Sequence, residues 1–211
     1  MHDKDTKSGI IILGRGGHAK VIRDIVESIT TYSISCSGRL YVQDMADWDE
    51  NTRIITGKKY IVGFGALRNL RRRAACFNAI VKGGGIPVTL ISPHAVVSPR
   101  AQIRPGTVIM PKAVVGPDAI ICMNCIINTG AVVEHDAVIG SNVHVSTNAV
   151  VNGGCNIFHN CLIGSGAIVK QGTIIYQNNI IGAGAVVVKH ITEQGGVYVG
   201  VPARKLKSVG E

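Results

Sequence analysis

A histidine between two carboxylates is the clearest candidate for chemistry in the sequence. Glu134, His135 and Asp136 are consecutive. Adjacent carboxylates can orient an imidazole ring and raise its basicity, as a general base requires. The plainer alternative is that His135 is a solvated residue of a turn. His144 follows nine residues later, His159 is predicted to lie on the surface, and no G-x-S-x-G segment supports a serine hydrolase.

A glycine-rich turn is a second candidate, for binding an anion. Residues 14–19 join a predicted strand, residues 9–13, to a predicted helix, residues 19–28. Backbone amides at such a helix start can face a phosphate, although a tight turn also needs glycines. About 90 residues make only half of a dinucleotide-binding fold, so a UDP-type nucleotide fits better than a nicotinamide cofactor. Asp44 follows a second predicted strand, residues 40–42, and could contact the nucleoside.

A six-residue repeat must position the histidines, because it fills residues 94–189 without a gap. The fourth position of all sixteen hexads is Val or Ile, and the second is mostly Ala, Cys or Thr. These two positions share the parity of a strand, so both side chains point to the same side. Three short strands then form one coil, and stacked coils pair their backbones in parallel. The sixteen hexads predict a parallel β-helix of five coils and one further strand.

The cysteines are not predicted to form a metal or redox site. Cys122 and Cys125 spell C-x-x-C, but a zinc site needs a second pair or histidines at ligand spacing. The repeat also places the two on different strands. Cys125, Cys155 and Cys161 occupy the small inward position of their hexads. We therefore expect buried structural thiols and no bound metal.

The residues before the repeat alternate between strands and helices. Apolar runs at residues 9–13, 40–42 and 60–64 predict strands, whereas residues 19–28 and 66–80 show helical spacing. Such alternation predicts a small parallel sheet of Rossmann-like type. We expect two domains, an α/β domain over residues 1–91 and a β-helix with a C-terminal tail over residues 92–211.

Composition and charge limit the class of protein. Hydrophobic residues make up 46% and charged residues 17%, which excludes a disordered chain. No apolar stretch is long enough for a membrane span and the N-terminus is polar, so we expect no membrane span, no secretory signal and a cytoplasmic location. The net charge of +9 favours anionic partners. The densest basic run, residues 68–73, lacks aromatic residues for base stacking, which favours phosphorylated small molecules over nucleic acid.

Several segments in order resemble the bacterial sugar acetyltransferases of the sialic-acid and bacillosamine type: residues 11–21, residues 133–140, the hexads, residues 181–186 and residues 200–203. The resemblance covers nearly the whole chain. Many acyltransferases share the hexads, whereas the glycine-rich turn joined to them is more specific. The family implies a left-handed β-helix, a homotrimer, and an active site between neighbouring β-helices with acetyl-CoA in the groove between them.

The resemblance also implies roles for individual residues. His135 matches the general base, and Asp136 matches the acid that orients it. His144 matches a histidine near the acyl group, and with Gly153 and Ala183 it is expected to bind acetyl-CoA. The N-terminal domain is expected to bind the nucleotide of the sugar through the following residues: Gly14, Arg15, Gly16, Gly17, His18, Asp44 and Arg68.

The expected function is transfer of acetyl from acetyl-CoA to the amino group of a UDP-linked 4-amino-deoxy sugar, in the biosynthesis of a surface glycan or a glycoprotein sugar. O-acetylation of a sialic acid is the nearest alternative, because the same residues can act on a hydroxyl group. An alternative of another class is a non-catalytic trimeric scaffold that binds a nucleotide sugar. The histidine between two carboxylates favours an enzyme.

Overall fold

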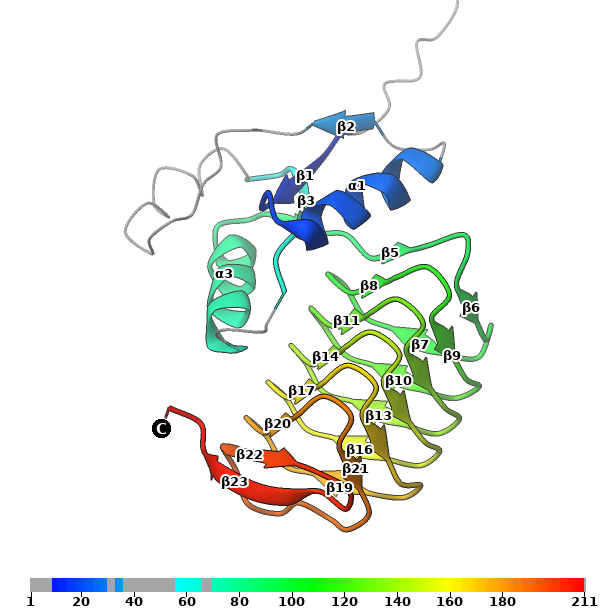
Figure 1. Ribbon diagram of the computed structural model, residues 1–211. Helices are drawn as coiled ribbons and strands as arrows, with labels where there is room; N and C mark the ends of the chain where they lie inside the picture. The colour runs from blue at the N-terminus through cyan, green and yellow to red at the C-terminus, as the bar shows by residue number, and fades with distance from the viewer. Residues whose placement is uncertain (1–8, 30–32, 36–55, 66–69, 211) are drawn as a thin grey trace, which may run out of the picture.

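The computed structural model describes residues 9–29, 33–35, 56–65 and 70–210. Two parts follow one another along the chain, a small α/β domain and a long coil of short strands (Figure 1). No helix within these ranges is long and apolar enough to cross a membrane.

The N-terminal part is a parallel sheet with a helix on each face. Its order is β2-β1-β3-β4, with strands β1 (Gly9–Leu13), β2 (Ser33–Ser35), β3 (Lys59–Val62) and β4 (Ile86–Pro87). Alternate residues of β1 point to opposite faces. Ile10 and Ile12 pack with α1 (Gly17–Ser28), whereas Ile11 and Leu13 pack with α3 (Leu70–Lys82). The predicted Rossmann-like sheet is therefore confirmed.

The element boundaries differ from the predicted ones by a few residues. α1 begins at Gly17, two residues early, because Gly16 is extended and its carbonyl accepts a hydrogen bond from the Lys20 amide. β3 ends at Val62, two residues before the predicted end, and its ladder with β1 closes with the hydrogen bond from the Gly63 amide to the Leu13 carbonyl, 2.7 Å. The predicted strand over residues 40–42 and the start of the helix predicted from residue 66 lie outside the described residues.

The second part is a parallel β-helix whose strands form three sheets. We call these sheets face 1, face 2 and face 3. Face 1 contains β5 (Leu90–Ile91), β8 (Val108–Ile109), β11 (Ile126–Ile127), β14 (His144–Val145), β17 (Leu162–Ile163) and β20 (Ile180–Ile181). Face 2 contains β6 (Val96–Val97), β9 (Val114–Val115), β12 (Val132–Val133), β15 (Val150–Val151), β18 (Ile168–Val169) and β21 (Val186–Val187). Face 3 contains β7 (Gln102–Ile103), β10 (Ile120–Ile121), β13 (Val138–Ile139), β16 (Asn156–Ile157) and β19 (Ile174–Ile175).

The interior of the β-helix is built from the fourth hexad positions, as predicted. Val133 pairs in register with Val151, and Val151 with Val169. All three side chains are 0% exposed. Each inward residue therefore stacks on its equivalent in the next coil. The second-position cysteines are buried free thiols, as predicted: Cys125, Cys155 and Cys161.

The β-helix is longer than the repeat at both ends. β5 pairs with β8 and so joins face 1 before residue 94. At the other end β22 (Gly196–Val199) pairs with β20, and β23 (Arg204–Ser208) pairs with β22 in antiparallel fashion. This terminal hairpin lies against the last coil (Figure 1).

The two parts share a hydrophobic core where they meet. Ile25 and Val26 of α1 belong to the same buried cluster as Val108 and Met110 of the first coils. The sheet of the N-terminal part is thereby held over one end of the β-helix, beside face 1.

Candidate active site

His135 lies at the corner where the chain passes from face 2 to face 3. It follows β12, and its side chain is 50% exposed. Its Nδ1 atom lies 2.7 Å from Oδ2 of Asp136. Because the carboxylate accepts the proton of Nδ1, the lone pair of Nε2 is available to accept another proton.

The neighbouring carboxylates raise the pKa of His135 above its ordinary value. The hydrogen bond that Nδ1 donates to Asp136 is the largest cause, and the charges of Asp136 and Glu134 act in the same direction. A raised pKa makes the neutral imidazole a stronger base. The arrangement therefore combines the orientation and the basicity that proton removal requires.

Gly153 lies beside the His135 ring, in the next coil. The two coils are joined by a hydrogen bond from the Gly154 amide to the His135 carbonyl, 2.9 Å. A Cβ atom added at Gly153 would lie 2.6 Å from both Cε1 and Nε2 of His135, which is closer than real atoms approach. Glycine at this position leaves room for the ring and borders its free Nε2 atom.

His144 lies on another surface, the outer side of face 1. The N-terminal part covers it, so the residue is 4% exposed, and a Cβ atom added at Gly65 would lie 3.5 Å from its Cε1. Burial, followed by the charge of Arg73, lowers the pKa of His144 to about 4, so the ring is neutral near pH 7. The Oδ1 atom of Asn128 accepts the amide of Thr129, so Nδ2 of Asn128 donates to Nε2 of His144, 3.2 Å away. The proton of this neutral ring then resides on Nδ1.

The glycine-rich turn lies next to His144, at the start of α1. The Nε2 atom of His18 is buried and has no hydrogen-bond partner among the described residues. Burial, then Arg73 and His144, lower the pKa of His18. Gly14 has φ of 135°, and a Cβ atom there would lie 2.7 Å from the Gly63 carbonyl oxygen, so the close approach of two loops requires glycine. The rest of the turn is exposed: Arg15, Gly16 and Gly17.

The predicted acetyl-CoA and catalytic residues do not come together within one chain. His135 and Gly153 lie at the corner between faces 2 and 3, whereas His144 lies on face 1 and Ala183, exposed, at the corner between faces 1 and 2. The filled interior of the β-helix separates these places. A site that contains all four residues therefore needs a second chain. Two of the predicted sugar-binding residues lie outside the described ranges: Asp44 and Arg68.

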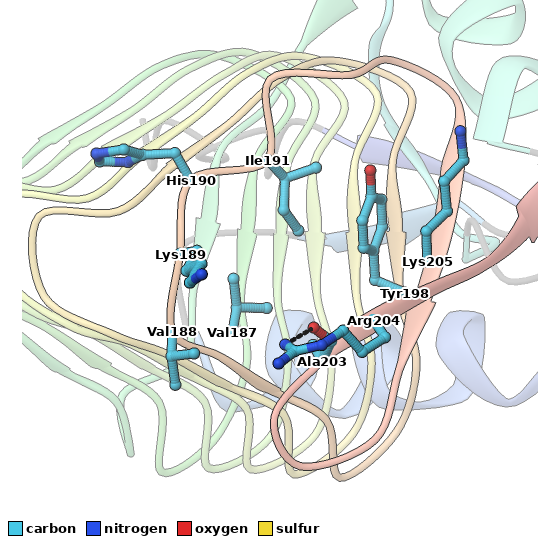
Figure 2. A pocket seen from close by; sticks show the side chains of 9 residues that line it. All are labelled: Val187, Val188, Lys189, His190, Ile191, Tyr198, Ala203, Arg204 and Lys205. Carbon is cyan, nitrogen blue, oxygen red and sulfur yellow. Dashed lines mark hydrogen bonds between the residues drawn. The ribbon is translucent and has the colours of Figure 1, made fainter.

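Two hollows lie further along the His135 corner, towards the end of the β-helix. Cationic and aromatic side chains line the first hollow, of about 310 Å³, between the last coil and the terminal hairpin (Figure 2): Lys189, His190, Tyr198, Arg204 and Lys205. The second, of about 580 Å³, shares Lys189 and His190 and adds Lys170. Lys189 occupies the same corner position as His135 three coils later, which is about 14 Å at the usual strand spacing.

Sequence reasoning missed several of these residues. The sequence gives no role to His190, which directly follows the repeat, yet the terminal hairpin makes it part of a hollow. The eighteen-residue period of the coils does point to Asn128. It makes Ile126 the direct neighbour of His144 in face 1, and Asn128 comes two residues after Ile126. No sequence pattern points to Gly65 or Arg73, because their contacts arise only where the two parts meet. In the described part of the chain, no cluster of His, Cys, Asp and Glu could hold a metal ion.

Comparison with known proteins relates the chain to sugar acetyltransferases. A family model of bacterial transferase hexapeptide repeats matches residues 100–135, and a PglD N-terminal domain model matches residues 9–38. The acetyltransferase domain of PglB from Neisseria gonorrhoeae is 30% identical with a TM-score of 0.82, over 94% of this chain and 99% of that one. PerB from Caulobacter crescentus, solved with CoA and GDP-perosamine, is 29% identical with a TM-score of 0.82, over 94% and 97%.

A more distant structure shares the fold. WeeI from Acinetobacter baumannii is 23% identical with a TM-score of 0.76, over 94% of this chain and 99% of that one. The sequence has no significant match among curated proteins.

A parallel β-helix with a histidine–carboxylate pair at its corner defines an acyltransferase of the hexapeptide-repeat class. Two observations narrow this class to one family. The chain begins with an α/β domain, and it resembles the PglB acetyltransferase domain over almost the whole length of that domain. The chain belongs to the bacterial hexapeptide-repeat sugar acetyltransferases.

Proposed function

We propose that the protein transfers an acetyl group from acetyl-CoA to the amino group of a UDP-linked 4-amino-deoxy sugar, in the biosynthesis of a surface glycan or a glycoprotein sugar. The observation that carries the proposal is the His135–Asp136 pair, with its free Nε2 beside Gly153. Relatives support acetyl-CoA and a nucleotide-linked amino sugar as the two classes of substrate, because the PglB domain was solved with acetyl coenzyme A and PerB with CoA and GDP-perosamine.

His135 acts as the general base of this proposed reaction. Its Nε2 accepts a proton from the sugar amine as the nitrogen attacks the thioester carbonyl. The new C–N bond forms and the C–S bond breaks. Coenzyme A leaves as a thiolate, which takes the proton from the His135 imidazolium and becomes the thiol. Asp136 holds the ring with its proton on Nδ1 and stabilises the imidazolium that forms. No acyl-enzyme is needed, because a neutral amine is already a nucleophile.

The coenzyme is proposed to lie along the His135 corner. Gly153 borders the reacting atoms, and the cationic hollow lies about three coils further on, roughly 14 Å away. Coenzyme A carries its phosphates at the opposite end of a long arm from its thioester. Lys189 and Arg204 can therefore pair with these phosphates while the acetyl group reaches His135.

The active site is proposed to form between chains of a homotrimer. Every outward residue of face 2 is a branched apolar side chain: Val96, Val114, Val132, Val150, Ile168 and Val186. Val96 is 66% exposed and Ile168 is 41% exposed in the single chain. A second chain that covers this stripe would bury apolar surface. The same contact can place His144 and Ala183 of one chain opposite the His135 corner of another.

The nucleotide sugar is proposed to bind to the N-terminal domain, residues 1–91, and to meet acetyl-CoA at the β-helix domain, residues 92–211. The turn at residues 14–18 supports this, because its backbone amides begin α1 and no acidic residue occupies the first turn of that helix. Asp44 and Arg68 are proposed to contact the same ligand. His18 ends this turn and is close enough to His144 for the charge of one ring to affect the pKa of the other.

An acceptor screen tests the function. The purified protein is mixed with acetyl-CoA and a thiol reagent, and the release of coenzyme A is followed with a UDP-4-amino-deoxy sugar, a GDP-4-amino-deoxy sugar, a free sialic acid or no acceptor. The proposal expects fastest release with the UDP sugar. Faster release with the GDP sugar would change the nucleotide, and faster release with the sialic acid would favour O-acetylation. If no acceptor raises the rate of coenzyme A release above the rate without acceptor, the proposed function is contradicted.

A further inference from the structure

Arg73 of α3 is a buried cation whose role is not explained by the site described above. It is 1% exposed, and burial lowers its pKa to about 10, so it stays charged at neutral pH. Its Nη1 atom donates to the carbonyl oxygens of Val62, at 2.7 Å, and Phe64, at 2.8 Å. Within the described ranges no carboxylate pairs with it. Burying a charge without a counter-ion costs free energy, so the presence of Arg73 at this buried place needs an explanation.

The contacts of Arg73 join the two parts of the molecule. Val62 is the last residue of β3, and Phe64 lies in the segment 63–65 that follows it. Asn124, in contrast, belongs to the β-helix. Nε of Arg73 donates to the Asn124 carbonyl, and Nδ2 of Asn124 donates back to the Arg73 carbonyl, each at a distance of 3.4 Å. Asn124 in turn begins a ladder of side-chain hydrogen bonds that continues through Asn142, Asn160 and Asn178. Arg73 is therefore anchored to the rigid part of the β-helix.

The segment 63–65 lies between the glycine-rich turn and His144. A Cβ atom at Gly14 would lie 2.7 Å from the Gly63 carbonyl oxygen, and a Cβ atom at Gly65 would lie 3.5 Å from Cε1 of His144. The carbonyls that Arg73 binds belong to this stretch. Moving Arg73 would therefore move the backbone that lies between the glycine-rich turn, which ends at His18, and His144.

Three buried nitrogen atoms in this region lack hydrogen-bond partners among the described residues: Nη2 of Arg73, Nε2 of His18 and Nδ1 of His144. No internal hydrogen bond at these atoms fixes the distance between the two rings. Asn128 holds Nε2 of His144 but does not reach the other ring. The position of the two rings relative to each other therefore depends on the backbone around them, which Arg73 binds.

We propose that Arg73 is a positioning residue that holds the segment 63–65 against the β-helix and so fixes His18 and His144 relative to each other. The proposal rests on the proposed function only in assigning His18 to the sugar side and His144 to the acetyl-CoA side. Arg73 is buried and touches neither substrate. It acts through the two histidines.

The charge of Arg73 has a second effect on both rings. After burial, it is the largest cause of the lowered pKa of His18 and of His144. The other titratable groups coupled to Arg73 are the thiols of Cys76 on α3 and Cys125 in the β-helix, and burial raises the pKa of each to about 12. These thiols are neutral at pH 7, so no titration among them offsets the cation. Burial and the charge of Arg73 together therefore keep both imidazoles neutral at pH 7.

Two variants separate position from charge. Arg73→Met removes the charge and the hydrogen bonds, whereas Arg73→Lys keeps the charge and loses the two-carbonyl geometry. Histidine pKa values are measured by NMR on the full-length protein, with His18→Asn and His144→Asn variants to assign the signals. In Arg73→Met we expect the pKa of His144 to rise from about 4 towards the ordinary value and that of His18 to rise with it. In Arg73→Lys both should stay close to the wild type.

Steady-state kinetics give the second measurement. Both variants should lose roughly 10- to 100-fold in kcat/KM through misplaced substrates, with a smaller loss for Lys. Arg71→Met is the matched control, because it removes the same charge from the exposed side of α3 and should leave both histidine pKa values unchanged.

Unchanged histidine pKa values in Arg73→Met, or full kcat/KM in both variants, would overturn the proposal. If Arg73→Met does not fold, a loss of kcat/KM in Arg73→Lys with unchanged pKa values supports positioning, and full kcat/KM there contradicts it. The NMR measurement does not depend on the acceptor, so failure of the proposed function is distinguished from failure of this inference.

Discussion

At the scale of single residues, chemistry depends on which nitrogen of each histidine is free. Asp136 binds Nδ1 of His135 and leaves Nε2 available, whereas Asn128 binds Nε2 of His144 and leaves the proton on Nδ1. The neighbouring carboxylates raise the pKa of His135, whereas burial and then the charge of Arg73 lower the pKa of His144. Opposite environments of this kind suit opposite roles, a base that accepts a proton and a neutral group that can donate one.

Replacing the proposed base should abolish most of the activity. His135→Ala is expected to lower kcat by roughly 10²- to 10⁴-fold, because that is the usual contribution of a general base. The affinity for acetyl-CoA should be nearly kept. His159→Ala is the control, since His159 is exposed and lies at a different corner. A kcat near the wild type in His135→Ala between pH 6 and 9 would remove the support for this assignment.

The pH profile should report the His135–Asp136 pair. A base works in its neutral form, so kcat/KM rises with pH through the pKa of His135, which the hydrogen bond to Asp136 raises. Asp136→Asn removes the charge, so the rising limb should move to lower pH and the maximal rate should fall. Asp118→Asn is the matched control, because Asp118 holds the equivalent position one coil earlier and pairs with Arg100. A limb at the wild-type pH in Asp136→Asn would show that another group titrates.

At the scale of the elements, each two-residue strand has one inward and one outward side chain. In β10, Ile121 is 0% exposed inside the β-helix, whereas Ile120 points outward from face 3. The strands are too short to be stable alone. Their stability comes from stacking on equivalent residues of neighbouring coils.

Truncation of an inward residue should therefore be far more costly than truncation of its outward neighbour. Ile121→Ala is expected to lower the free energy of unfolding by about 2–5 kcal/mol, through lost burial and a cavity that the stacked coils cannot close. Ile120→Ala provides the same chemical change as a control and should cost less. Denaturant unfolding followed by circular dichroism measures both. Equal losses would mean that the inward stacking is not the main source of stability.

At the scale of the whole molecule, the filled interior of the β-helix keeps the His135 corner apart from face 1. The proposed site therefore requires one chain to supply His135 and another to supply His144. The apolar stripe on face 2 offers a surface for that association. We expect sedimentation to give three times the mass of the 22.2 kDa chain.

Mixed trimers test the shared site. His135→Ala and His144→Ala should each be poorly active alone, but coexpression should restore activity, because roughly a quarter of the sites in random trimers combine both intact histidines. Coexpression of His135→Ala with itself under two different tags is the control and should restore none. No recovery in mixed trimers of verified composition would contradict a site built from two chains.

The amino-acid sequence is enough to predict the β-helix and the contact between histidine and carboxylate at its corner. The hexad period is local and repeated, so the inward position of residues such as Val133 follows from strand parity alone. The His135–Asp136 contact is likewise between neighbours in the chain, and the sequence was enough to suggest it.

The surroundings of His144, by contrast, follow from the packing of the N-terminal part against the β-helix. The sequence predicts that its side chain points outward from the β-helix, which the structure shows, but not that the N-terminal part buries it under Gly65 and beside Arg73. These contacts join residues far apart in the chain, and no periodic pattern encodes them. The cationic hollow arises in the same way, because the terminal hairpin folds back on the last coil and brings Arg204 near Lys189. Contacts between distant segments depend on how whole elements dock, and that is a property of the complete fold.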